Sequence, residues 1–136
     1  MDTLEHSIAG LPAFGLYFVS SLALLALFIA IYIAITPYRE LVLIREGNVA
    51  AAASLSGTVL GFAIPLAQAV AQSGSLVDMA LWGSIALVAQ LVVFFAMTRV
   101  IPGIARDIPE GRVAQGVFLG AVSLATGILN AACMTY

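Results

Sequence analysis

Hydrophobic and polar positions divide the chain into four long apolar segments joined by three short polar connections. The apolar segments are expected at residues 14–36, 49–71, 79–98 and 113–136. A helix rises about 1.5 Å per residue, so about 20 residues are enough to cross a hydrocarbon core of about 30 Å. Each segment reaches that length without a charged side chain. The pattern predicts an all-α, polytopic membrane protein with four transmembrane helices.

The overall composition indicates the same class of protein. Of the 136 residues, 62% are hydrophobic and only 9% are charged, whereas soluble domains carry about 25% charged residues. The first apolar run follows an acidic flank, "MDTLEHS", and is too long for a signal peptide, so it is expected to remain as a spanning helix. The lipid bilayer is therefore the expected environment. The chain has no lysine and no basic cluster, so no nucleic-acid partner is expected.

The positions of the arginines predict how the helices are oriented. All five flank the first and third connections: Arg39, Arg45, Arg99, Arg106 and Arg112. Loops rich in Lys and Arg lie on the cytoplasmic side of bacterial membranes. We therefore expect the first and third connections in the cytoplasm and both termini outside, in a multi-pass protein of the bacterial inner membrane.

Two stretches of similar sequence mark an internal repeat. "REGNVAAAASLSG" begins at Arg45, and "PEGRVAQGVFLGA" begins at Pro109, so that Glu46-Gly47 and Glu110-Gly111 lie 64 positions apart. Each half reads as a helix, a connection ending in Glu-Gly, and a second helix. The sequence predicts a short outer segment at 1–13 and two parallel-repeated helical hairpins at 14–72 and 73–136.

The stretches "REGNVAAAASLSGTVLGFAIPLAQA" and "ARDIPEGRVAQGVFLGAVSLATGILNAACM" resemble the bacterial inner-membrane family DUF350. The resemblance covers nearly the whole chain from about Phe14. Its most characteristic features here are Glu46-Gly47-Asn48, Pro65 and the closing "LNAA" at 129–132. It implies a two-helix domain present twice in the inner membrane. The family name assigns no activity, so the resemblance supports fold and location rather than function.

Small residues recur four apart in the second helix of each half. They are expected to form helix-packing faces, within or between subunits, because small side chains let backbones approach closely. The residues concerned are Ala52, Ser56, Gly57, Gly116, Gly120, Ala121 and Ala125. A backbone-lined pathway is the alternative. Pro65 should break its helix by freeing the carbonyl of Gly61, with Gln68 or a Ser or Thr of a neighbouring helix as candidate partners.

Four amides lie within the predicted spans: Gln68, Gln72, Gln90 and Asn130. An unpaired amide in hydrocarbon costs several kcal/mol, so each needs a partner, a water molecule or a cavity. Interhelical hydrogen bonding is one interpretation, and a polar path for a solute or ion is the other. Gln68 and Asn130 both fall in the outer half of the bilayer, where they could meet.

The connections carry the remaining charged candidates: Arg39, Arg45, Glu46, Arg99, Arg106, Glu110 and Arg112. Such charges commonly only set topology, and docking of a cytoplasmic partner protein is the alternative. In "RELVLIREGN", Leu41, Val42 and Ile44 alternate with Arg39, Glu40 and Arg45. That spacing suits a short amphipathic helix lying in the membrane interface.

Two functional hypotheses follow. The first is a non-catalytic, oligomeric membrane component or scaffold, such as an envelope or stress accessory, whose cytoplasmic linkers bind a partner. The second is a pore- or carrier-forming subunit for a small ion or polar solute. No catalytic set, cofactor motif or metal-ligand spacing occurs in the sequence, so an enzyme is not expected.

Overall fold

The structure is a computed structural model that describes residues 2–134, and it is helical nearly throughout. Its helices are α1 (Asp2–Ala9), α2 (Leu11–Ile35), α3 (Glu40–Arg45), α4 (Val49–Gln72), α5 (Leu76–Val100), α6 (Ile104–Asp107) and α7 (Val113–Cys133). Four helices are long and apolar enough to span a membrane. The predicted all-α membrane fold is therefore confirmed.

The observed spans differ from the expected ones mainly at their ends. The first span begins at Leu11, and residues 2–9 of the expected outer segment form the helix α1. The third span begins three residues earlier and ends two residues later than expected. Residues 135 and 136, included in the fourth span from sequence, lie outside the described residues. Hydropathy shows poorly where a helix stops, because caps and turns decide that locally.

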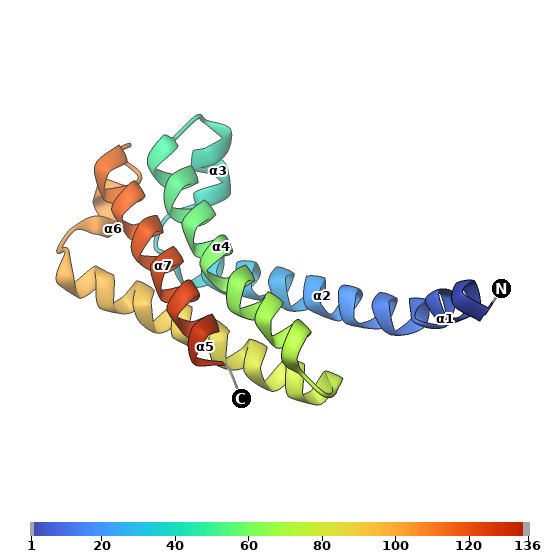
Figure 1. Ribbon diagram of the computed structural model, residues 1–136. Coiled ribbons are helices and arrows are strands. Elements are labelled where there is room, and N and C mark those ends of the chain that lie inside the picture. The colour runs from blue at the N-terminus through green and yellow to red at the C-terminus, as the bar shows by residue number, and fades with distance from the viewer. Residues whose placement is uncertain (1, 135–136) are drawn as a thin grey trace.

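Helices α4 and α7 lie side by side and run in the same direction, while α2 and α5 run the opposite way (Figure 1). Helix α5 packs against both α4 and α7. The two polar connections that contain α3 and α6 lie at the same end of the molecule (Figure 1). We call residues 37–48 the first linker and residues 101–112 the second linker.

Helix α2 is the most exposed of the four spanning helices. Its N-terminal half and α1 project from the bundle as an arm (Figure 1). Only Phe28 and Tyr32, both in its C-terminal half, are buried. Large apolar side chains such as Phe14, Phe18 and Val19 are exposed along the arm. Such a surface is compatible with lipid but not with water.

Aromatic rings join α2 to the rest of the bundle. The ring of Phe28 stacks on Phe62 of α4, with centroids 4.4 Å apart. Tyr32 meets Phe94 of α5 edge to face at 5.3 Å. All four side chains are buried. The core is therefore located where the C-terminal half of α2 crosses α4 and α5, close to the linkers.

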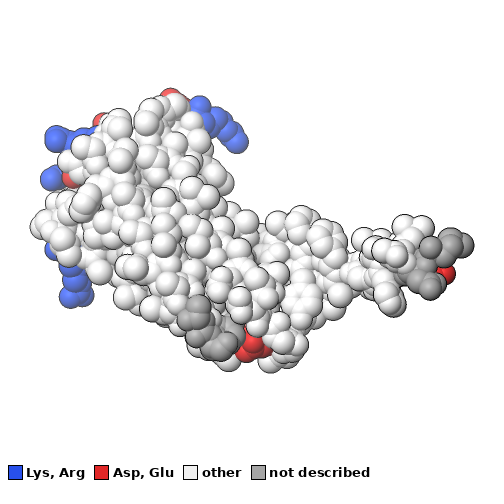
Figure 2. Space-filling model, viewed as in Figure 1, with Lys and Arg blue, Asp and Glu red and all other residues white. Residues whose placement is uncertain are grey.

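The basic side chains gather at one end of the molecule. Figure 2 shows them over the linker end of the bundle and none along the arm. All five arginines are exposed. Their common location follows from the antiparallel course of successive spans, which returns both linkers to the same side.

Candidate functional site

Helices α4 and α7 approach so closely that their glycines have no room for a side chain. A Cβ atom added to Gly57 would overlap the backbone of Gly120, and one added to Gly127 would overlap the carbonyl of Gly61. Likewise, Gly116 lies against the backbone of Ala50. We call this contact the α4–α7 seam. Close backbone packing at small residues is the usual way in which membrane helices associate.

The seam uses some, but not all, of the small residues singled out from sequence. Gly57, Gly116 and Gly120 lie in it. In contrast, Ser56, Ala121 and Ala125 are exposed and Ala52 is half-buried, so for these four residues packing against another subunit stays a prediction. The seam instead continues through Ala50, Ala53, Gly61, Ser123 and Gly127. Several small-residue stripes coexist on each helix, and sequence spacing alone does not tell which one faces the neighbour.

Pro65 leaves the carbonyl of Gly61 without its usual helical partner, and Gln90 of α5 replaces that partner. The Nε2 group of Gln90 donates to the Gly61 carbonyl at 3.0 Å and to the Ser123 carbonyl at 3.0 Å. The side chain is 0% exposed. One amide thus joins three helices at the seam. Gln68, the partner suggested from sequence, is not the one that binds Gly61.

The other predicted amides lie away from this junction. Gln68 is half-buried, and Gln72 is exposed at the end of α4. Asn130 Nδ2 is buried without a hydrogen-bond partner among the described residues, so it does not donate to Gln68. The structure therefore does not join these two side chains. The Oε1 atom of Gln90 is also buried and unpartnered.

Both linkers end in the same local structure. Gly47 and Gly111 have positive φ angles of 86° and 79°, a backbone conformation that glycine adopts without a steric penalty. In the first linker the Asn48 N–H donates to the Leu43 carbonyl, and in the second the Arg112 N–H donates to the Asp107 carbonyl. Each pair of residues is five apart, as in a Schellman C-cap. The Glu-Gly boundary thus ends one helical turn and starts the next spanning helix.

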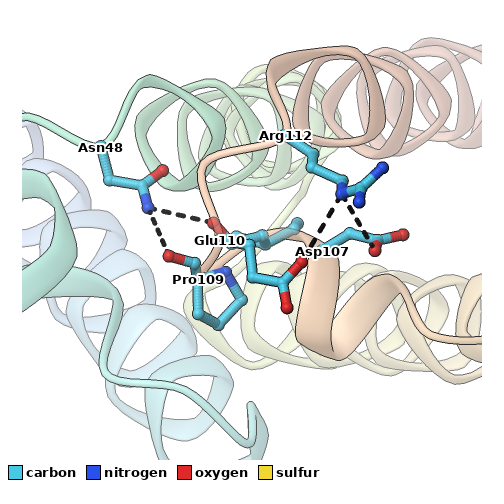
Figure 3. A network of polar contacts seen from close by, with 6 residues as sticks. Asn48, Asp107, Pro109, Glu110 and Arg112 are labelled. Atoms are coloured by element: carbon cyan, nitrogen blue, oxygen red, sulfur yellow. Dashed lines mark hydrogen bonds and ion pairs between the residues drawn. The ribbon is translucent and has the colours of Figure 1, made fainter.

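Asn48 connects the two linkers to each other (Figure 3). Its Oδ1 accepts from the N–H of Ala51 at 2.9 Å and caps α4. Its Nδ2 donates to the carbonyls of Ile108 at 3.0 Å and Pro109 at 3.3 Å. The side chain therefore holds the second linker against the start of α4. From the sequence, Asn48 stands out only as part of the resemblance to the family.

Arg112 occupies the corresponding position in the second half and does something different. Its Nε lies 3.5 Å from a carboxylate oxygen of Glu110 and 3.8 Å from one of Asp107 (Figure 3). These ion pairs stay within the second linker. Arg112 does not cap α7 through its side chain. Arg112 thus makes no counterpart of the hydrogen bonds by which Asn48 joins the two linkers.

Glu40 is buried, whereas the amphipathic pattern of its helix groups it with the charged residues. It is 0% exposed, although Leu41 and Val42 beside it are exposed. Both carboxylate oxygens lack a hydrogen-bond partner among the described residues. The short helix α3 exists as predicted, but its charged side is not uniformly turned to solvent. Helical spacing identifies two faces and cannot say which one packs against α4.

Burial changes the acidity of this region. Desolvation raises the pKa of Glu40 from its usual value to about 7. The pKa of the nearby Tyr38 hydroxyl is also raised, first by burial and then by the charge of Glu40. The missed residues had a sequence signal: Tyr32, Thr36 and Glu40 recur every four residues.

The comparisons with known proteins agree with this architecture. Residues 6–134 match the family described as Domain of Unknown Function (DUF350). This chain belongs to the DUF350 family. The match covers both halves, including the seam, the linkers and Glu40.

Two relatives of this DUF350 chain come from Escherichia coli and Bacillus subtilis. It is 43% identical over 131 residues to the UPF0719 inner membrane protein YjfL of Escherichia coli K12, covering 96% of this chain and 99% of that protein. It is 27% identical over 133 residues to the UPF0719 transmembrane protein YshE of Bacillus subtilis, covering 96% and 97%. No solved structure matches the chain. Both relatives are named as membrane proteins, in line with the four spanning helices.

Proposed function

We propose that this protein is a non-catalytic component of the bacterial inner membrane whose joined linkers form a docking face for a cytoplasmic protein. The arginine pattern supports a cytoplasmic location for the linkers and an outer location for both termini. The chain would work as a homo-oligomer, for which the unpartnered arm of α2 offers contact surface.

The observation that carries this proposal is the contact between Asn48 and the second linker. It makes one surface out of two segments that are 64 positions apart in the sequence. A pocket of about 340 Å³ lies between them, lined by Glu46, Asn48 and Glu110 among others. Arg45 and Arg106 belong to the same two linkers, and both are exposed. Mixed charge on a preorganised surface favours specific recognition of a partner.

The use of Gln90 supports the same function. Its donor group is occupied by two backbone carbonyls inside the chain, as interhelical packing requires and a wet path does not. The alternative, a pore- or carrier-forming subunit, is supported by the unpartnered Gln90 Oε1 and Asn130 Nδ2. In an oligomer, those two atoms would have to line a shared polar path.

Site-specific photocrosslinking in living cells tests the docking face. A photoreactive amino acid would replace Arg45 in one variant and Arg106 in another. Val77, which lies in the first turn of α5 at the opposite end and is 81% exposed, would serve as control. We expect the same heterologous protein to be captured from both linker positions and not from the control. Asn48→Ala should reduce both crosslinks, because it releases one linker from the other. Crosslinks that join only copies of this chain would contradict docking of another protein and would support oligomerisation alone.

A further inference from the structure

Glu40 lies in an enclosed cluster of oxygen atoms between three parts of the chain. Tyr32 on α2 and Tyr38 in the first linker are close enough for their hydroxyls to interact with the charge of Glu40. Thr36 lies beside the carboxyl group. From α4, Thr58 faces Tyr32 and Ser54 faces Tyr38. We call these six residues the Glu40 cluster, and all six are buried.

The cluster has more acceptors than donors. Thr36 Oγ1 donates to the Ile33 carbonyl, Ser54 Oγ to the Ala51 carbonyl and Thr58 Oγ1 to the Ser54 carbonyl. These hydroxyls already donate to backbone carbonyls, and each of their oxygens keeps lone pairs that can face the cluster. An ionised carboxylate is also only an acceptor. The donors that remain are the hydroxyls of Tyr32 and Tyr38, neither of which has a hydrogen-bond partner among the described residues.

No positive side chain balances Glu40. In the part of the chain that the structure describes, the ion pairs are those of Arg112 in the other linker. Arg39 and Arg45 stand at the two ends of α3, but both are exposed. The titratable groups that face Glu40 are Tyr32 from α2 and Tyr38 from the linker, and α4 contributes only hydroxyls. Buried charges in proteins are normally paired or coordinate a metal ion.

We propose that the Glu40 cluster binds one monovalent alkali-metal cation, which exchanges with a proton on Glu40. A set made only of oxygen atoms suits a hard cation rather than zinc or copper. A single carboxylate supplies one negative charge, which matches one positive charge. Divalent calcium and magnesium usually draw on several carboxylates or on phosphate. Sodium is the probe we select, because a compact cluster suits a small ion.

This site does not depend on the docking function. Its location between α2, α3 and α4 sets it apart from the Asn48 contact. A bound cation would neutralise the carboxylate, join the end of α2 to α4 and so hold the first linker in place. The proton, when bound, removes the charge but supplies only one hydrogen bond.

Thermal unfolding of the purified full chain in detergent tests the site. Melting would be followed in sodium, potassium and choline chloride of equal ionic strength, at about pH 8.5 and about pH 5.5. We expect saturating sodium at the higher pH to raise Tm by about 4 °C or more over choline. The effect should disappear at the lower pH, where the proton occupies Glu40. An equal Tm in all three salts at both pH values would overturn the proposal.

Matched variants distinguish this site from general salt effects. Glu40→Gln should lose the sodium effect, while Glu46→Gln, which alters an exposed glutamate of the same linker, should keep it. If pH alone acts through Glu40 and sodium has no effect, the site binds only a proton and the cation is ruled out. A sodium effect that persists in Glu40→Gln also overturns the proposal.

A second measurement covers the case in which Glu40→Gln does not fold. Tyr38→Phe keeps the carboxylate and removes one oxygen of the cluster. Retention of radioactive sodium by the wild-type chain and by this variant should show at least a tenfold weaker affinity in the variant. Equal retention by both, or none by the wild type, would contradict the site.

Discussion

At the scale of single residues, Gln90 and Glu40 show two fates of a buried polar side chain. Both are 0% exposed. The amide group of Gln90 donates to two carbonyls, whereas the Glu40 carboxylate has no hydrogen-bond partner among the described residues. The first side chain therefore stabilises packing, and the second makes stability depend on pH and on ions.

Gln90 and Pro65 should be energetically coupled. Gln90→Leu leaves the Gly61 carbonyl without a donor, because Pro65 cannot supply one, and should cost about 1–2 kcal/mol of unfolding free energy. Pro65→Ala restores a backbone N–H four residues after Gly61, so Gln90→Leu should cost less in that background. The unfolding free energies of the wild-type chain, the two single variants and the double variant, measured in mixed micelles, would complete this double-mutant cycle. The coupling is contradicted if the losses of unfolding free energy in the two single variants add up to the loss in the double variant.

Stability should fall as the pH rises through the range in which Glu40 ionises. The folded-state pKa of Glu40 is about 7, above the ordinary value of 4.5, so the folded chain binds the proton more tightly than the unfolded one. Stability is then highest below about pH 4.5 and decreases up to about pH 7, by about 3 kcal/mol in total. Chemical unfolding in a choline buffer would show this slope. Glu40→Gln should be flat over the same range, and an equal slope in that variant would assign it to other groups.

At the scale of elements, the seam between α4 and α7 depends on missing side chains. Glycine normally weakens a helix, yet α7 carries it at 116, 120 and 127 where α4 comes closest. The close approach brings the Gly61 and Ser123 carbonyls within reach of one amide. The seam and the Gln90 contact therefore support each other.

Alanine in place of a seam glycine should force the two helices apart. In Gly127→Ala the new methyl group would overlap the Gly61 carbonyl, and we expect a loss of about 1–3 kcal/mol of unfolding free energy. Gly15→Ala is the matched control, because nothing lies within 4 Å of that position in α2. It should be neutral or stabilising by up to about 1 kcal/mol. Similar unfolding free energies for the two variants would show that the seam is looser than described.

At the scale of the whole molecule, positive charge and the apolar arm occupy different regions. The arginines lie at the linker end, and the projecting arm of α2 is apolar (Figures 1 and 2). A bilayer accommodates this arrangement, because lipid covers the arm while the linkers remain in water. The proposed orientation then places the docking face and the Glu40 cluster on the cytoplasmic side.

Cysteine labelling would test the orientation. In a Cys133→Ser background, Gly74→Cys should react with a membrane-impermeant thiol reagent from outside only, and Arg45→Cys from the cytoplasmic side only. Ala86→Cys lies one turn from Gln90 on the same buried face and leaves the amide intact. It should not react from either side. Reaction of Ala86→Cys would indicate a water-filled path and favour the pore. If Gly74→Cys reacted only from the cytoplasmic side and Arg45→Cys only from outside, the topology would be the reverse of the one proposed.

The fold was largely predictable because its main determinants are local. Hydropathy and length predict the four spans, and arginine placement predicts that the two linkers lie together. The Glu-Gly boundaries predict where α4 and α7 begin, since glycine with a positive φ ends one turn and lets the next helix start. Each of these signals depends on a few consecutive residues or on composition.

Other features were decided only by the tertiary structure. Which small-residue stripe forms the seam, which amide reaches the Gly61 carbonyl, and whether Glu40 faces inward all depend on how the helices are rotated about their axes. Rotation is set by packing between segments that are distant in the chain, such as Gly61 with Gly127 and Asn48 with Ile108. The sequence by itself determined a four-helix membrane protein with its arginines at one end. The close approach of its helices decided which polar groups are satisfied and which, such as the carboxylate of Glu40, are buried without a partner among the described residues.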